Sequence, residues 1–78
     1  MKKLTLEKMQ RDSTLSEIQR MAAGCLIETR KKNGHRDIDS AAAMLGLHYD
    51  NLSWDERVEY VTIVADAADD IEWFAQNE

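Results

Sequence analysis

The sequence has no proline, one cysteine and only three glycines. Because proline is the residue that most strongly breaks a helix from within, its absence favours long, uninterrupted helices. The lone Cys25 cannot form an internal disulfide, which is typical of a protein of the reducing cytoplasm. Residues 1–11 mix charged and apolar side chains and predict no signal peptide, and no apolar run is long enough to span a membrane.

The sequence also lacks the motifs of catalysis and of metal binding. His35 and His48 have no metal-ligand spacing with each other or with Cys25, and no cysteine pair is present to hold zinc. The chain contains no Gly-rich phosphate loop and no nucleophile motif, and its 78 residues leave little room for an enclosed pocket. We therefore expect a binding protein, with no enzymatic activity, no cofactor and no metal site.

Apolar and charged residues are abundant and follow helical periodicity. Hydrophobic residues make up 44% of the chain and charged residues 32%, a balance typical of a small globular domain. Residues 14–33 predict a helix that begins with a capping box of Thr14 and Glu17 and ends at Asn33–Gly34. Gly24, inside this helix, is either a tolerated weak point or the place where a second helix comes close. The inward stripe of this helix consists of Leu15, Ile18, Ala22, Cys25, Leu26 and Thr29.

Two shorter elements flank this helix. We expect residues 1–12 to form a lead-in segment or a short first helix, because their apolar residues do not extend the inward stripe. Residues 38–46 predict a short helix with Asp37 or Asp39 as its cap and Gly46 as its end.

The longest predicted helix covers residues 53–76. Ser53 and Glu56 form another capping box at its start, and Trp54 is expected to anchor that start in the core. Together the elements predict an all-α fold: a small three-helix bundle with a short extra N-terminal helix or turn, in a single domain over residues 1–78. The inward stripe of the long helix consists of Trp54, Val58, Val61, Val64, Ala65, Ala68, Ile71 and Ala75.

Charge is divided unevenly along the chain. Residues 1–36 hold nine basic and four acidic groups, a balance of +5, and residues 37–78 hold one basic group and eleven acidic groups, a balance of −10. The two halves together give the net charge of −5. Each half is expected to attract a surface of opposite charge. Attraction between the halves would neutralise part of this imbalance and would still leave a negative surplus.

The negative surplus is ordered along the long helix. Asp55, Glu59 and Asp66 share the face opposite the inward stripe, and Asp69 and Asp70 continue it. Like charges one turn apart cost about 0.2–0.5 kcal/mol for each pair, so local stability would not select this row. The row is either a solvated face that keeps an acidic protein in solution or a docking surface for a basic partner.

Two aromatic residues are candidates to anchor such a partner. Trp73 lies near the acidic row and Tyr60 lies beside the inward stripe, and aromatic side chains are enriched at interface hot spots. Packing of Trp73 against the N-terminal segment is the alternative. The candidate partner-binding residues are therefore Asp55, Glu59, Asp66, Asp69, Asp70, Trp73 and Tyr60.

Residues 41–52 resemble the centre of a helix-turn-helix, with Gly46 as the turn glycine and Leu52 six residues after it. That motif presents its second helix to the major groove of DNA. The corresponding segment here carries Asp55 and Glu56, and acidic side chains repel DNA phosphates. A plain helix, a glycine stop and a loop are therefore favoured. The basic N-terminal half keeps direct nucleic-acid contact as an alternative.

The leading hypothesis is a non-enzymatic regulator or inhibitor that docks the acidic helix face on a larger protein with a basic surface. Its sharpest version is DNA mimicry, because carboxylates one turn apart recur about every 5–6 Å and DNA phosphates are similarly close. In size and charge, though in no motif, the chain resembles small acidic helical proteins of phages and mobile elements, including inhibitors of bacterial defence complexes. A helix-turn-helix transcriptional regulator and a small adaptor or assembly subunit, monomeric or homodimeric, are the alternatives.

Overall fold

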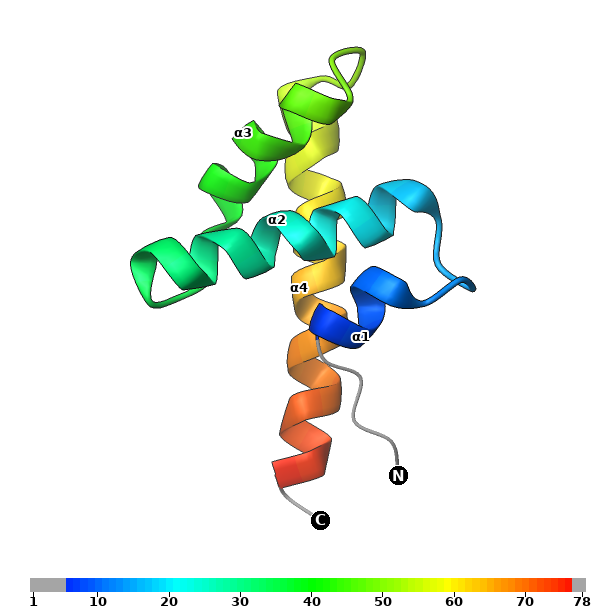
Figure 1. Cartoon of the computed structure of the whole chain (residues 1–78), viewed down its shortest axis with the longest axis vertical. Coiled ribbons are helices and arrows are strands. Elements are labelled where there is room, and N and C mark those ends of the chain that lie inside the picture. Colours follow the sequence, from blue (N-terminus) through cyan, green and yellow to red (C-terminus); the bar gives the residue numbers. More distant parts are fainter. Residues whose placement is uncertain (1–5, 77–78) are drawn as a thin grey trace.

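The computed structural model describes residues 6–76 of the chain, and the side chains of residues 6–68. This part folds into four α-helices and no strand: α1 (Leu6–Arg11), α2 (Glu17–Asn33), α3 (Ile38–His48) and α4 (Trp54–Gln76). In Figure 1, α2 crosses the long helix α4, α3 turns back into α4 as a hairpin, and α1 lies beside α2. The predicted all-α bundle with a short extra N-terminal helix is confirmed. None of the described helices is both long and apolar enough to cross a membrane.

The core lies where α2 crosses α4, and α1 and α3 pack against the crossing. Leu26, Leu45 and Val61, from α2, α3 and α4, are completely buried. α1 adds Leu6 and Met9, which the periodicity of the sequence did not assign to the core. The buried apolar residues are Leu6, Met9, Ala22, Ala23, Cys25, Leu26, Ile27, Ala41, Ala42, Leu45, Val61, Val64, Ala65 and Ala68.

The inward stripes are only partly as predicted. Leu15, Ile18 and Val58 are half-buried, so the core covers the ends of the two stripes less completely than their centres. Ile71 and Ala75 lie outside the residues whose side chains are described.

Helix α2 begins later than the sequence predicted. The residue that caps it is Ser16, whose hydroxyl accepts the Gln19 N–H at 3.2 Å while the Gln19 side chain accepts the Ser16 N–H at 3.0 Å. The predicted capping box of Thr14 and Glu17 is wrong, because Thr14 is held in the preceding turn. Its backbone N–H and its hydroxyl both donate to the Asp12 carboxylate, at 2.9 and 2.6 Å.

The end of α2 is as predicted, and it leads directly into the cap of α3. Gly34 takes the left-handed conformation, with φ of 78°, that ends a helix without strain on a side chain. Asp37 then caps α3 by accepting the N–H and the hydroxyl of Ser40 at 3.2 and 3.0 Å. The buried hydroxyl of Thr29 accepts the Asp37 N–H at 3.2 Å, which ties the start of α3 to α2.

Helix α3 does not end at Gly46, as predicted, but continues to His48. Gly46 has no left-handed backbone conformation that would end a helix. Its missing side chain has another use: the guanidinium group of Arg57, from α4, lies where a Cβ at this position would be. Gly46 therefore allows an α4 side chain to pack directly on the backbone of α3.

Gly24 of α2 marks a close approach. The side-chain nitrogen of Gln10, at the end of α1, lies 2.9 Å from the position that a Cβ on Gly24 would occupy. A larger residue at this position would push the Gln10 side chain aside. Of the two interpretations of this glycine, the structure favours close packing of a second helix, which here is the short helix α1.

Candidate partner-binding surface on helix α4

The acidic face of α4 is built by helical spacing. Asp55, Glu59 and Asp66 are four and seven residues apart, which places them on one face of the helix, and all three side chains are exposed. Thr62, between them, is half-buried. The opposite face carries the buried stripe that packs against α2 and α3. We call Asp55, Glu59 and Asp66 the acidic face.

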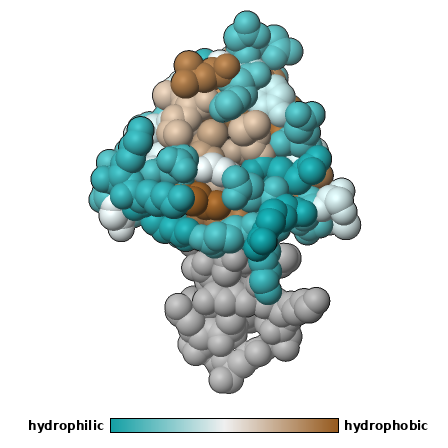
Figure 2. All heavy atoms as spheres, in the orientation of Figure 1, coloured by the Kyte–Doolittle hydropathy of each residue, from teal (hydrophilic) through white to brown (hydrophobic). Residues whose placement is uncertain are grey.

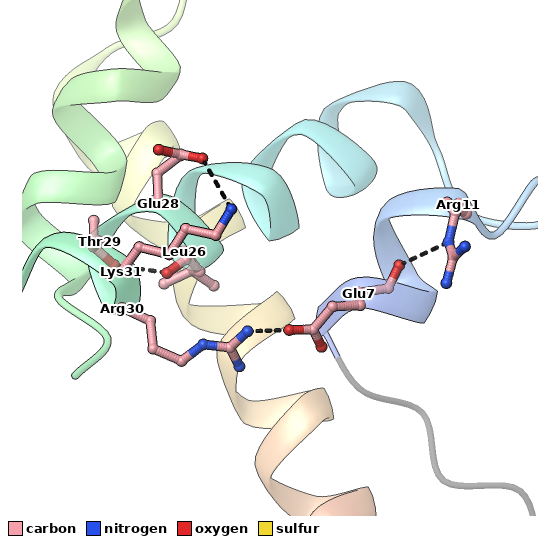
Figure 3. Close-up of polar contacts among 7 residues, drawn as sticks. All are labelled: Glu7, Arg11, Leu26, Glu28, Thr29, Arg30 and Lys31. Atoms are coloured by element: carbon pink, nitrogen blue, oxygen red, sulfur yellow. Dashed lines mark hydrogen bonds and ion pairs between the residues drawn. The ribbon is translucent and has the colours of Figure 1, made fainter. Parts of the chain in front are cut away.

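The basic half of the chain reaches α4 at Arg36, whose guanidinium group donates to the carbonyl of Ala65, the residue before Asp66, at 3.4 Å. Within the described residues, none of the three carboxylates of the acidic face accepts a hydrogen bond or forms an ion pair. Arg30 instead forms an ion pair with Glu7, and Lys31 forms one with Glu28 (Figure 3). Part of the positive charge of the basic half is thus paired with glutamates of α1 and α2.

The start of α4 is fixed by the capping box that the sequence predicted. The Ser53 N–H donates to the Glu56 carboxylate at 2.9 Å, and the Glu56 N–H donates to the Ser53 hydroxyl at 3.2 Å. The hydrogen bonds from Ser53, the backbone one first, lower the pKa of Glu56 below its ordinary value. Glu56 therefore remains ionised as it adds a further negative charge beside the acidic face.

Beside the acidic face lies a small hollow. It is lined by Glu56, Glu59, Tyr60 and Ile63 and has a volume of about 180 Å³. Ile63 is 49% exposed, which is unusual for an isoleucine, whereas Tyr60 is half-buried and packs against the edge of the core. The structure thus brings the candidates Glu59 and Tyr60 together. It also adds Ile63, which is not among the candidate residues that the sequence predicted.

Trp54 does not anchor α4 in the core, as the sequence predicted, and is 45% exposed. The first turn of α4 lies beyond the crossing with α2, so α3 is the element beside it, and α3 presents Gly46 there instead of a side chain. Arg57 fills the space: its guanidinium carbon lies 5.6 Å from the centre of the Trp54 ring, and its Nε donates to the Ser53 carbonyl at 3.3 Å. The one cation of residues 37–78 is therefore held against the hairpin.

Three candidate residues belong to the C-terminal part of α4. The helical backbone of α4 continues to Gln76, but the side chains of Asp69, Asp70 and Trp73 lie outside the described residues. Their part in the surface stays a prediction.

A different surface lies on the outer side of α3. Apolar residues gather over this helix in Figure 2, whereas much of the remaining coloured surface is hydrophilic. Leu47 is 85% exposed, Ala43 is exposed and Met44 is half-buried. We call Ala43, Met44 and Leu47 the apolar surface of α3. It carries no charge, in contrast to the acidic face.

The segment that resembles a helix-turn-helix forms most of α3 and the loop before α4. Figure 1 shows α4 running back past α3 as a hairpin. The first turns of α4, which would have to enter the DNA groove, expose Asp55, Glu56 and Glu59. These carboxylates would face the phosphates.

A second hollow, of about 280 Å³, is lined by Gln10, Glu17, Arg20 and Met21. It is an open depression between the end of α1 and the start of α2. The Nε of Arg20 is buried and has no hydrogen-bond partner in the described part of the chain, but the rest of this side chain is partly exposed. Among the described residues, no group of three His, Cys, Asp or Glu side chains could hold a metal ion.

No protein-family model matches the chain, and neither does any curated protein or solved structure.

Proposed function

We propose that the chain is a non-enzymatic binding protein that docks the acidic face of α4 on a basic surface of a larger protein. The observation that supports this function is the exposure of Asp55, Glu59 and Asp66 on one side of the helix, with no cationic partner among the described residues.

Electrostatics gives this surface two expected properties. Aligned like charges repel one another within the free protein, and a basic partner would remove this repulsion. The same alignment steers an oppositely charged surface toward α4 and speeds association, and this effect weakens as salt screens it. The exposed Ile63 and the half-buried Tyr60 supply apolar area beside the charges, as interface cores require.

The sharper form of the proposal is inhibition of a nucleic-acid-binding protein by mimicry of DNA. Along α4 the carboxylates of Asp55 and Glu59 are about one helical turn, or about 6 Å, apart, a spacing similar to that of phosphates along a strand. An inhibitor of a bacterial defence complex, encoded by a phage or a mobile element and acting in the cytoplasm, would use a surface of this kind.

The experiment that tests the proposal reverses charge on the acidic face. The double variant Glu59→Lys/Asp66→Lys and the wild type are used to capture proteins from extracts of the cells that carry the gene. A captured protein is then purified and its affinity is measured at several salt concentrations. We expect the wild type to capture a protein with a basic surface, with an affinity that falls as salt rises, and the reversed variant to lose this capture.

The matched control is Asp39→Lys/Asp50→Lys. It changes the net charge by the same amount, and both of its side chains are exposed and lie outside α4. The control is expected to capture the partner as the wild type does. Equal capture by the wild type and the Glu59→Lys/Asp66→Lys variant would overturn the proposed function. If the wild type releases a labelled DNA duplex from the purified partner, mimicry of DNA is supported. If the partner binds the wild-type chain and the duplex at the same time, mimicry of DNA is refuted.

A further inference from the structure

The hollow beside the acidic face has the size of a single side chain. Pockets for small-molecule ligands have volumes of about 300–1,000 Å³, and this hollow has about 180 Å³. It is also open along one side of a helix that the described residues leave uncovered. Its dimensions therefore fit one projecting side chain of a docked partner better than a free metabolite.

The lining of the hollow combines charge with apolar surface. Glu56 and Glu59 supply carboxylates one turn of α4 apart, and Tyr60 and Ile63 supply an aromatic ring and an exposed aliphatic side chain. The Glu56 carboxylate accepts one hydrogen bond from the Ser53 N–H, which leaves further lone pairs on its two oxygens. A ligand that complements this lining has a cationic head and an aliphatic stem.

Of the two cationic side chains, arginine matches the lining better than lysine. The planar guanidinium group presents five N–H donors, which suits two neighbouring carboxylates, and it also stacks on aromatic rings. Its three methylene groups can pack on an apolar side chain such as that of Ile63. The ammonium group of lysine is compact and strongly hydrated, so it gains less from leaving water for a partly apolar hollow.

We propose that the hollow lined by Glu56, Glu59, Tyr60 and Ile63 binds one arginine side chain of the basic partner. This inference rests on the proposed function, because it assigns the partner residue that the acidic face receives. It makes the hollow the site where the partner is anchored, while Asp55 and Asp66 orient the basic surface around it.

The test compares an oligo-arginine peptide with an oligo-lysine peptide of the same length, titrated at low salt into the isotope-labelled full chain. Binding is followed by NMR, and each affinity is measured by calorimetry. We expect oligo-arginine to bind about two- to fivefold more tightly, because a guanidinium group stacks on an aromatic ring and pairs with two carboxylates better than an ammonium group does. The largest chemical-shift changes are expected at Glu59, Tyr60 and Ile63.

Two variants show whether the preference comes from the hollow. Ile63→Ser removes the exposed apolar side chain of the hollow, and Leu47→Ser makes the same kind of change on the outer side of α3. We expect the arginine preference to disappear in Ile63→Ser and to persist in Leu47→Ser. Both positions are exposed, so both variants should fold, and circular dichroism checks that they do.

The outcomes separate this inference from the proposed function. Equal affinity for the two peptides, or a preference that survives Ile63→Ser, would overturn the arginine-binding site while the acidic face could still bind its partner. Binding of neither peptide would also overturn the arginine-binding site. The capture experiment with the Glu59→Lys/Asp66→Lys variant would then decide the proposed function separately. Self-association that Ile63→Ser abolishes would assign the hollow to a second copy of the chain and refute an arginine of the partner.

Discussion

Replacement of Leu6 by alanine is expected to lower the free energy of unfolding by about 2–4 kcal/mol. Leu6 lies in the short helix α1, and its side chain is 1% exposed in the core that α1 shares with α2 and α4. Leucine-to-alanine changes in protein cores cost about 2–5 kcal/mol, and the cost falls when the surroundings can close the cavity. Because α1 has only six residues and can shift, we expect a value in the lower part of that range.

This loss is large for so small a protein. A chain of this length has a total stability of about 4–12 kcal/mol, so Leu6→Ala would remove a substantial share of it. Urea unfolding followed by circular dichroism measures the change. The matched control is Leu47→Ala, the same substitution at a position that is 85% exposed, where we expect a change within about 0.5 kcal/mol. Equal effects of the two substitutions would refute the packing of α1 into the core.

Three further predictions concern polar and ionisable groups of the core and its caps. Thr29→Val should lower the free energy of unfolding by about 1–3 kcal/mol, because it leaves the Asp37 N–H without its acceptor. Urea unfolding measures this change, and an unchanged free energy of unfolding would contradict the prediction. Hydrogen bonds from Ser40 lower the pKa of Asp37 below its ordinary value of 3.8, so the stability it contributes is present above that value and is lost as pH falls through the lowered pKa. The acid-side slope of stability against pH should therefore be shallower in Asp37→Asn, and an identical slope would count against this cap. Burial raises the pKa of the Cys25 thiol, so a thiol reagent should modify the folded protein far more slowly than the protein in urea; equal rates would show that Cys25 is accessible.

Elements with strong local signals could be predicted from the sequence. Gly34, with its left-handed backbone, ends α2 where the Asn33–Gly34 pair predicted, and the box of Ser53 and Glu56 starts α4 as expected. These features depend on residues within a few positions of one another, so the sequence contains the whole interaction. The exposure of Asp55, Glu59 and Asp66 follows from the same helical periodicity.

Features that depend on tertiary contacts, or on a choice between two neighbouring caps, could not be predicted. Thr14 is as good a cap as Ser16 in sequence, and only the turn that binds it to Asp12 decides between them. Gly46 resembles a helix end until Arg57, eleven residues later, is seen to lie against it.

The hollow on α4 shows the same limit. All four of its lining residues come from α4, and whether another helix covers Ile63 depends on how the helices pack.

The most direct test of the central claim is a footprint of the bound partner on the chain. Cross-saturation from the unlabelled partner to the isotope-labelled chain identifies the residues that lie in the interface. We expect attenuated signals at Glu59, Ile63 and Asp66 of α4, and unchanged signals at Ala43 and Leu47 of α3. A footprint on the outer side of α3, with α4 unaffected, would contradict docking through the acidic face.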